Sequence, residues 1–406
     1  MSYIPKVFAI QHGARHRYAV PRMLHSLDYL TGLFTDSHAG SPLGKLAGTA
    51  RRLLPRFAPI ARLADREIKG VPLDLVSATD RWVFQQRSLR RLAAEDTTAW
   101  LKARDKSWYA LARSAIAKGT NILYSMGGEN LRLLQQAKNS GIRVVSDAFI
   151  TPLNLRQTRD AKMAHGIPVS KDEEDCQHVE EHYNRVFGCS DIILCPSQWV
   201  ADGVVALSPG HLSKIRICQY GSSLPPSPAI RKPVAGRIFW AGGDWFRKGL
   251  HHLAAAADLA KACNPAIEFR IAGITDPQVL AMPVFRNLRF LGKLDRQGMQ
   301  REFASADLFV FPTLSEGMAS VLIEAIASGC PVITTSGAGF DGLEESGAGR
   351  VLKVGETQAL ATAIVNLVGD RPTLHGMSEA SARFAPRFTE AAWADRLGYI
   401  LREVAL

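Results

Sequence analysis

The sequence predicts an α/β protein with two doubly wound domains that face each other across a central cleft. A chain of 406 residues, 47% of them hydrophobic, is too long for one small core, and two domains are the default at this length. The segment Ser222–Gly236 holds four prolines in fifteen residues, which predicts a semi-rigid linker between two halves. Apolar runs alternate with helical segments on both sides of it, as in parallel sheets with crossover helices.

The predicted elements follow the chain in order. In the N-terminal half, β-favouring apolar runs predict strands at Lys6–Ile10, Asn121–Tyr124, Arg143–Ser146 and Asp191–Cys195, with a helix over Asn130–Ser140. In the C-terminal half, they predict strands at Arg237–Gly242, Glu268–Gly273, Leu288–Gly292, Leu308–Pro312, Pro331–Thr335 and Arg350–Val354. The helices expected between these strands cover Leu250–Cys263, Asp295–Ala306 with Asp295 as N-cap, Ser320–Ser328 and Thr357–Val368. Because the strands are continuously apolar, helices should cover both faces of the sheet.

The formal charge of +11 is concentrated near the N-terminus. Residues 1–118 hold 20 basic and 9 acidic side chains, whereas the C-terminal half is nearly neutral. This asymmetry indicates an anionic partner, with phosphate, nucleic acid and an acidic lipid surface as the alternatives.

The cysteines and the apolar runs indicate the cellular compartment of the protein and its relation to a membrane. The six cysteines form no C-x-x-C pair and lie mostly in apolar stretches, so we expect buried thiols in a reducing cytoplasm. Residues Met1–Ile10 are typical of a first strand and not of a signal peptide. No run approaches the roughly 20 apolar residues of a membrane-spanning helix, so any membrane contact should be peripheral.

Two glutamates lie where a predicted strand ends and a helix begins. Glu316 precedes the helix and Glu324 lies within it. Open α/β sheets bind ligands at such strand ends, and the free N–H groups of the helix start favour an anion such as a diphosphate. Two carboxylates at different depths can accept hydrogen bonds from two hydroxyl-bearing groups. The alternative is a helix-capping glutamate followed by an ordinary helical one.

A glycine-containing turn with two basic residues follows the first strand of the C-terminal half. The segment Ala241–Gly249 contains Gly243, Arg247 and Lys248. Glycine lets the backbone approach a phosphate closely, and the two cations can neutralise it. Solvated basic residues in an ordinary turn are the alternative.

Together these residues resemble the retaining glycosyltransferases of family 4, which have the GT-B fold of two Rossmann-like domains. The residues that carry the resemblance are Glu316 and Glu324 in the family's E-x7-E spacing, Ala325, Gly329, Pro331 and Val332 after them, Lys248-Gly249, and the strand at Asn287–Gly292. The resemblance covers about residues 190–370 and is weak over residues 1–190, the half that binds diverse acceptors.

The resemblance implies a nucleoside-diphosphate sugar, linked to UDP or GDP, as co-substrate. It implies no bound metal, because a lysine and backbone dipoles stabilise the leaving diphosphate. Glu316 would contact donor-sugar hydroxyls as a catalytic residue, Glu324 the nucleotide ribose, and Lys248 the diphosphate. The other implied donor-site residues are Gly317, Met318, Ala319 and Ser320, through their amides, and Leu294 near the nucleobase.

The resemblance also implies how the chain is divided. The N-terminal acceptor-binding domain would cover residues 1–221, the linker 222–236, and the nucleotide-sugar domain 237–387. The tail, 388–406, has Trp393, Leu397 and Tyr399 on a helical pattern, and its helix should cross back to the N-terminal domain.

Some positions depart from the family's pattern or match it loosely. Gly243 stands where the family usually has arginine, and Arg247 is the candidate to supply that charge. No histidine follows the strand at Arg143–Ser146, where the family often has one near the donor sugar. Phe149 is the nearest match there, and Asp147 is the candidate polar and catalytic partner. The acceptor-side candidates after the first strand are His12, Gly13 and His16, although an ordinary strand-to-helix turn would explain the same loop.

Two further motifs have functional alternatives. His178 and His182 match H-x-x-E-H, an inverted zinc-protease pattern, but no third ligand is evident and a solvated helix face is the better interpretation. Lys45–Lys69 holds seven basic residues with apolar residues at roughly helical spacing, broken by Pro55 and Pro59. Basic amphipathic segments bind anionic membranes, whereas the alternative is a helical hairpin packed on the domain.

The sequence is therefore interpreted as a cytoplasmic retaining glycosyltransferase, peripheral on the inner face of the cell membrane. It would move a sugar from the nucleotide donor to a hydroxyl of a glycan or lipid-linked acceptor, in polysaccharide or glycolipid assembly. The alternatives are a non-catalytic nucleotide-sugar-binding protein, a zinc peptidase using His178 and His182, and a GT-B epimerase or phosphorylase. Because the nucleotide site falls in the nearly neutral half, the N-terminal charge favours a lipid-phosphate acceptor or an anionic membrane surface, and no nucleic acid is needed to explain it.

Overall fold

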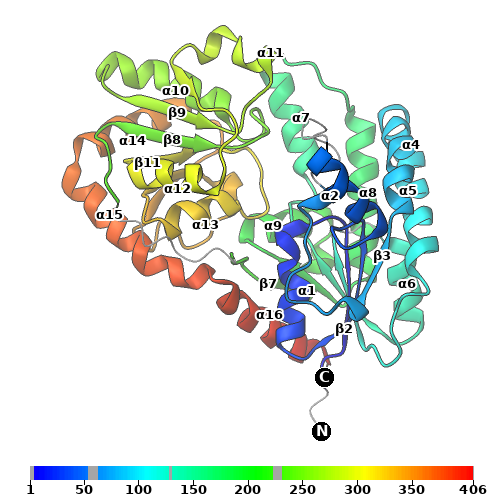
Figure 1. The fold of residues 1–406 in the computed structure, drawn as a ribbon. Helices are drawn as coiled ribbons and strands as arrows, with labels where there is room; N and C mark the ends of the chain where they lie inside the picture. Colours follow the sequence, from blue (N-terminus) through cyan, green and yellow to red (C-terminus); the bar gives the residue numbers. More distant parts are fainter. Residues whose placement is uncertain (1–3, 54–62, 128–129, 223–230, 406) are drawn as a thin grey trace.

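Two parallel sheets with helices packed against them make up the computed structural model, which describes residues 4–53, 63–127, 130–222 and 231–405 (Figure 1). Within these residues, the first sheet has seven strands in the order β3-β2-β1-β4-β5-β6-β7, and the second has six in the order β10-β9-β8-β11-β12-β13. The ladders within each sheet are parallel. The strand order reverses beside the first strand of each sheet, as in doubly wound folds, so the predicted fold class is confirmed.

The strands are short, and those at the centre of each sheet are almost fully buried. In the first sheet they are β1 Val7–Gln11, β2 Leu30–Asp36, β3 Val76–Thr79, β4 Ile122–Met126, β5 Arg143–Asp147, β6 Ile192–Cys195 and β7 Ile215–Ile217. In the second sheet they are β8 Arg237–Ala241, β9 Glu268–Ala272, β10 Leu288–Phe290, β11 Leu308–Phe311, β12 Val332–Thr335 and β13 Gly349–Leu352. Each strand predicted from the sequence is present, with ends within two residues of the prediction. The strands that were not predicted, β2, β3 and β7, include both edges of the first sheet.

The helices connect successive strands. Before the linker they are α1 Ala19–Ser26, α2 Pro42–Leu53, α4 Arg81–Glu95, α5 Thr97–Ala112, α6 Leu131–Asn139, α7 Asn154–Ala164, α8 Glu173–Cys189 and α9 Gln198–Leu207. After it they are α10 Leu250–Cys263, α11 Pro277–Leu280, α12 Arg296–Ser305, α13 Ser320–Ala327, α14 Thr357–Gly369, α15 Arg371–Phe384 and α16 Glu390–Ala405. The predicted cap is also present, because the Asp295 carboxylate accepts a hydrogen bond from the Gly298 amide at 2.7 Å. No helix in the described part of the chain is long and apolar enough to cross a membrane.

The last helix, α16, returns to the first half of the molecule and packs against α1 (Figure 1). The guanidinium of Arg22 forms two hydrogen bonds with the carboxylate of Glu390, at 2.6 and 2.7 Å. Arg216 pairs with Glu403 at the other end of the helix, and Trp393 is buried between them along the helix. The domain boundaries at 221, 236 and 387 stay a prediction, and residues 223–230 of the predicted linker lie outside the described residues.

Candidate functional site

The carboxyl ends of both sheets border one cavity of about 440 Å³. Its lining includes residues that follow β1, β5 and β7 of the first sheet and β8 and β11 of the second. Strands β8 and β11 are neighbours at the point where the strand order of the second sheet reverses. Such a switch point separates the loops on either side of it and leaves a crevice in which open α/β sheets bind ligands. The geometry therefore places the candidate site between the two sheets.

Glu316 lies at the centre of this site, between two cations. Its carboxylate oxygen Oε1 is 2.9 Å from Nη1 of Arg247 and 2.9 Å from Nζ of Lys248. The backbone fixes this arrangement, because the carbonyl of Arg247 accepts hydrogen bonds from the Leu314 amide at 2.8 Å and from Oγ1 of Thr313 at 3.0 Å. The two sequence motifs, which are about 70 residues apart, thus meet at one carboxylate.

Two glycines allow this close approach. Gly249 has a φ of +70°, and a Cβ at this position would lie 1.8 Å from the carbonyl oxygen of Pro312. A Cβ on Gly317 would lie 1.8 Å from the carbonyl oxygen of Phe149, which belongs to the first sheet's half of the chain. Oγ of Ser197 also donates to the Gly317 carbonyl at 2.6 Å. Only glycine fits where these backbones meet.

Glu324 lies on α13, between this cavity and a neighbouring one of about 450 Å³. The second cavity is also lined by Gly243, Lys248 and Leu294, so together with Glu324 four of the predicted donor-site residues border it. Burial raises the pKa of the Glu324 carboxyl, and the charges of Arg17 and Arg296 oppose that rise. The position that the family fills with arginine, Gly243, faces open space here.

The four residues from Gly317 to Ser320 differ in what they offer a ligand. Gly317, Met318 and Ser320 line the first cavity. The amide of Ala319 donates to the carbonyl of Ala338 at 3.0 Å, so it is already engaged. The sulfur of Met318 accepts from the Tyr220 amide at 3.2 Å and so joins the two halves. Of the four residues whose amides were predicted to bind the donor, Gly317, Met318 and Ser320 therefore remain available to a ligand, and Ala319 does not.

Asp147 is buried below the cleft and does not line either cavity. Its carboxylate accepts hydrogen bonds from the hydroxyls of Tyr124 and of Tyr220, the latter at 2.6 Å. Burial raises its pKa, although both tyrosine hydrogen bonds act in the opposite direction. This placement suits a residue that orients Tyr220, which does line the cavity, rather than one that touches a donor sugar.

Of the three site residues predicted in the loop after β1, His16 lines the cleft, whereas His12 and Gly13 do not. His16 lines the cleft and contacts the ring of Tyr220 at a centroid distance of 4.4 Å. Burial, and to a lesser degree the charge of Arg15, lowers the pKa of His16 to about 4. His12 instead stacks on Trp108 at 3.7 Å inside the first domain. The Gly13 amide donates to Asp36 at 2.9 Å, which closes the turn and keeps Gly13 out of the cleft lining.

Sequence reasoning missed two arginines of this loop, Arg15 and Arg17, which both line the cleft. The Arg15 guanidinium lies 3.6 Å from the ring centroid of Phe149, the residue that stands where the family often has histidine. His16, Arg17 and Tyr18 have φ values of 48°, 53° and 57°, an uncommon left-handed run for residues with side chains. Such strain persists only where surrounding structure imposes it, and it clusters at functional sites. The basic pair within the H-G-A-R-H-R run was the one available signal.

The zinc-peptidase hypothesis finds no support in the structure. His178 and His182 lie on α8 and line a cavity of about 820 Å³ beside α5 and α6, away from the strand ends. Within the described residues, the one group of three side chains positioned to hold a metal is elsewhere and includes neither of them.

The basic segment Lys45–Lys69 is described only in part, since residues 54–62 lie outside the described residues. Arg66 pairs with Asp36 at 2.9 Å and Lys69 with Glu67 at 2.9 Å. Leu46 on α2 is 64% exposed. Membrane binding by this segment stays a prediction.

The C-terminal part of the chain matches a known family. The family model described as "Glycosyl transferases group 1" matches residues 235–370, which contain strands β8 to β13 and both glutamates. The amylovoran biosynthesis glycosyltransferase AmsK of Erwinia amylovora is 24% identical over 276 residues, 62% of this chain and 66% of that protein. The GDP-mannose-dependent monoacylated alpha-(1-6)-phosphatidylinositol monomannoside mannosyltransferase of Corynebacterium glutamicum is 29% identical over 159 residues, 36% of this chain and 41% of that protein.

The likeness in structure extends over nearly the whole chain. The structure of HepE from Anabaena in complex with UDP-glucose superimposes with a TM-score of 0.59 and 13% identity, covering 98% of this chain and 99% of HepE. The match therefore includes the first sheet, where the sequence resemblance was weak.

Proposed function

This chain belongs to the group 1 glycosyl transferases, the family-4 glycosyltransferases with the GT-B fold, and from that membership we propose a specific activity for it. It transfers a sugar from a nucleoside-diphosphate sugar to a hydroxyl of a glycan or lipid-linked acceptor, with retention of the anomeric configuration. The observation that carries the proposal is the carboxylate of Glu316, held 2.9 Å from both Arg247 and Lys248 at the junction of the two sheets.

The charges around the cleft suit a donor with a diphosphate group. Arg15, Arg17 and Arg247 line the first cavity, and Lys248 and Lys293 line the second, against the two carboxylates of Glu316 and Glu324. A diphosphate gives Arg247 and Lys248 more than one anionic partner, so these cations can hold the leaving group while the Glu316 carboxylate turns to the sugar hydroxyls. Glu324, deeper on α13, then accepts from the ribose.

In the proposed reaction, the bond between the sugar C1 and the diphosphate oxygen breaks, and the acceptor hydroxyl attacks from the same face. The leaving diphosphate takes the hydroxyl proton. Glu316 and the cations stabilise the separating charges, and the closed contact at Gly317 keeps water from the reacting carbon. The anomeric configuration is retained because the acceptor attacks C1 on the same face from which the diphosphate leaves.

The substrates are proposed from the relatives. HepE was solved with UDP-glucose, and the mannosyltransferase of Corynebacterium glutamicum is named for GDP-mannose and a phosphatidylinositol acceptor. We infer a UDP- or GDP-linked donor and an anionic lipid or glycan acceptor at the inner face of a membrane. The basic residues of the first 118 positions support the second part of this inference.

The test is turnover of the donor by the full chain and by Glu316→Gln. Nucleoside diphosphate released from a panel of UDP- and GDP-sugars should fall by about 10²-fold or more in the variant, since a carboxylate that stabilises the transition state is lost. Affinity for the nucleoside diphosphate, measured by calorimetry, should stay within a few-fold. Glu174→Gln, at a 77% exposed side chain on α8, is the matched control. Wild-type turnover in Glu316→Gln would refute the site, whereas donor binding with no turnover in the wild type would favour a non-catalytic binding protein.

A further inference from the structure

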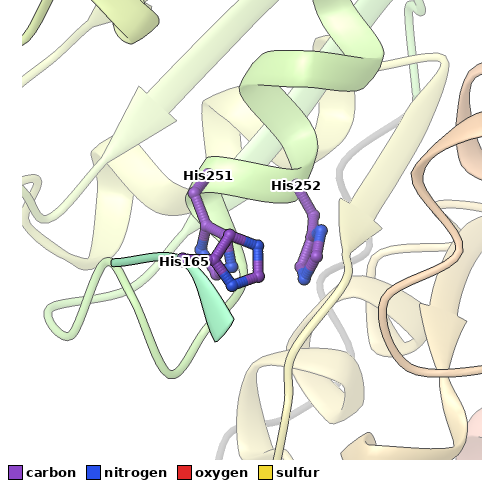
Figure 2. Close-up of side chains that lie close together, drawn as sticks. All are labelled: His165, His251 and His252. Carbon is purple, nitrogen blue, oxygen red and sulfur yellow. The ribbon is translucent and has the colours of Figure 1, made fainter. Parts of the chain in front are cut away.

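Three histidines gather where the two halves of the chain meet. His165 directly follows α7, whereas His251 and His252 lie in the first turn of α10. One nitrogen of each ring lies within 4.8 Å of one nitrogen of each of the other two rings. Figure 2 shows the three side chains close together. Neighbouring positions on a helix point about 100° apart, so His251 and His252 converge only because their rings turn toward His165.

Two of the three rings have a hydrogen-bond partner at Nδ1. Nδ1 of His165 lies 2.8 Å from the carbonyl oxygen of Ala161, which can only accept, so Nδ1 carries the hydrogen and Nε2 is a free acceptor. Nδ1 of His252 lies 2.9 Å from Oγ1 of Thr357, and when this nitrogen donates to the hydroxyl, its Nε2 is an acceptor as well. Histidines that bind metals characteristically have such a partner on the other ring nitrogen.

His251 supplies a second, independent observation. Both of its ring nitrogens are buried, and among the described residues neither has a hydrogen-bond partner. A buried polar atom without a partner costs free energy and requires an explanation, of which an ion is one. The ring is held in place by Phe246, which stacks on it at 4.3 Å with an interplanar angle of 7°.

We propose that His165, His251 and His252 bind one divalent transition-metal ion, zinc by ligand preference, which joins the two halves of the molecule. Three imidazoles leave a fourth tetrahedral position for water. A zinc site with Zn–N distances near 2.0–2.1 Å sets its nitrogens about 3.3 Å apart, so the rings must close by about 1.5 Å at most. His165 is exposed, and its ring can make that adjustment without disturbing the core.

An ion bound at the end of α7 would also affect the candidate site, because the start of the same helix contacts the loop that carries Glu316. Near its start, α7 also reaches the loop that carries Glu316, because Oγ of Ser315 donates to Oε1 of Gln157 at 2.8 Å. A metal at the end of α7 would therefore pin the whole helix to the second half. Among the described residues, the three histidines line neither of the two cleft cavities. The ion would therefore link the two halves of the molecule beside the site, and the proposal does not depend on the transferase activity.

The experiment is calorimetric titration of the full chain, freed of metal with a chelator, with zinc alone. We expect one saturable site in the wild type, and an affinity at least about 100-fold weaker in His165→Gln and in His251→Gln, because each removes one of three ligands. His375→Gln, at a 78% exposed ring on α15, should bind as the wild type does. The melting temperature should rise with zinc in the wild type and in His375→Gln, and not in His165→Gln.

His165→Gln keeps the test independent of folding, because its side chain lies on the surface, whereas His251 packs on Phe246. Substituting cobalt adds a spectroscopic check, since a tetrahedral site gives intense d–d absorption that the variants should lack. Equal zinc affinity in the wild type and His165→Gln, or no saturable site in the wild type, would overturn the proposal.

Discussion

The two sheets have the same strand order near their first strand, yet they contribute to the cleft in different ways. The second sheet supplies its cations and Glu316 from two loops, after β8 and β11, which are neighbours in the sheet. The first sheet supplies its lining from three loops, after β1, β5 and β7, with no shared motif. The second sheet's side of the cleft is therefore encoded locally, and the first sheet's side depends on tertiary structure.

The largest expected effect comes from adding a side-chain atom at Gly317, where the loop after β11 contacts the loop after β5. In Gly317→Ala, the new Cβ would lie 1.8 Å from the Phe149 carbonyl oxygen, so one side must move. We expect a loss of unfolding free energy of about 3 kcal/mol, with loss of donor turnover, because overpacked sites cost 1–3 kcal/mol or more. Chemical denaturation and the turnover assay measure the two effects.

Gly376→Ala on α15 is the control for this variant. No atom lies within 4 Å of its Cβ position, and alanine is the better helix former, so this variant should gain up to about 1 kcal/mol. If Gly317→Ala is as stable and active as the wild type, the contact between the two sides does not close the site.

A smaller effect should appear when only the donor side is changed. Lys248→Met removes the ammonium that lies 2.9 Å from Glu316 and 5.0 Å from the ring centroid of Phe311, and it keeps an unbranched apolar side chain. We expect nucleoside diphosphate to bind about 10- to 50-fold more weakly in calorimetry, since a hydrogen bond to a charged group contributes about 1.5–3 kcal/mol. Lys261→Met, at the end of α10, should bind as the wild type does. Unchanged affinity in Lys248→Met would place the diphosphate elsewhere.

The smallest effect concerns the opposite side, through His16. Its pKa is lowered to about 4 in the folded chain, so between pH 6.5 and 4 the unfolded chain binds a proton that the folded chain does not. Stability should therefore fall as the pH drops through this window. His16→Phe keeps a ring against Tyr220 and Trp393 and should flatten this pH dependence between pH 6.5 and 4. Parallel pH profiles of both proteins would contradict the assignment.

Sequence reasoning recovered the second sheet almost completely, for a physical reason. Its central strands β8, β11 and β12 are almost continuously buried, helix α12 begins at the side-chain cap Asp295, and the ligand site follows from strand order. The meeting of Glu316 with Lys248 could be expected because β8 and β11 are neighbours at the switch point. The E-x7-E spacing then placed Glu324 on the adjoining helix.

The first sheet was harder to predict because its signals are tertiary. The edge strands β3 and β7 have four and three residues and are partly exposed, so they lack a continuous apolar pattern. The local signal for Arg15 was only its place in a short basic run, and the left-handed backbone that follows it at His16, Arg17 and Tyr18 has no sequence pattern that predicts it. Asp147 ends a strand exactly as a ligand-binding carboxylate would, yet the two tyrosines that bury it lie 23 and 73 residues away.

The return of α16 to α1 has a consequence for how the molecule is made. A ribosome delivers the first sheet early, but the helix that covers α1 and pairs Glu390 with Arg22 emerges after both sheets. The ring of Trp393, which packs against His16 and Tyr220, arrives with it. The wall of the cleft nearest the N-terminus is thus finished only after the whole second domain has been synthesised. A chain that stops before α16 therefore leaves part of the core beneath this helix exposed.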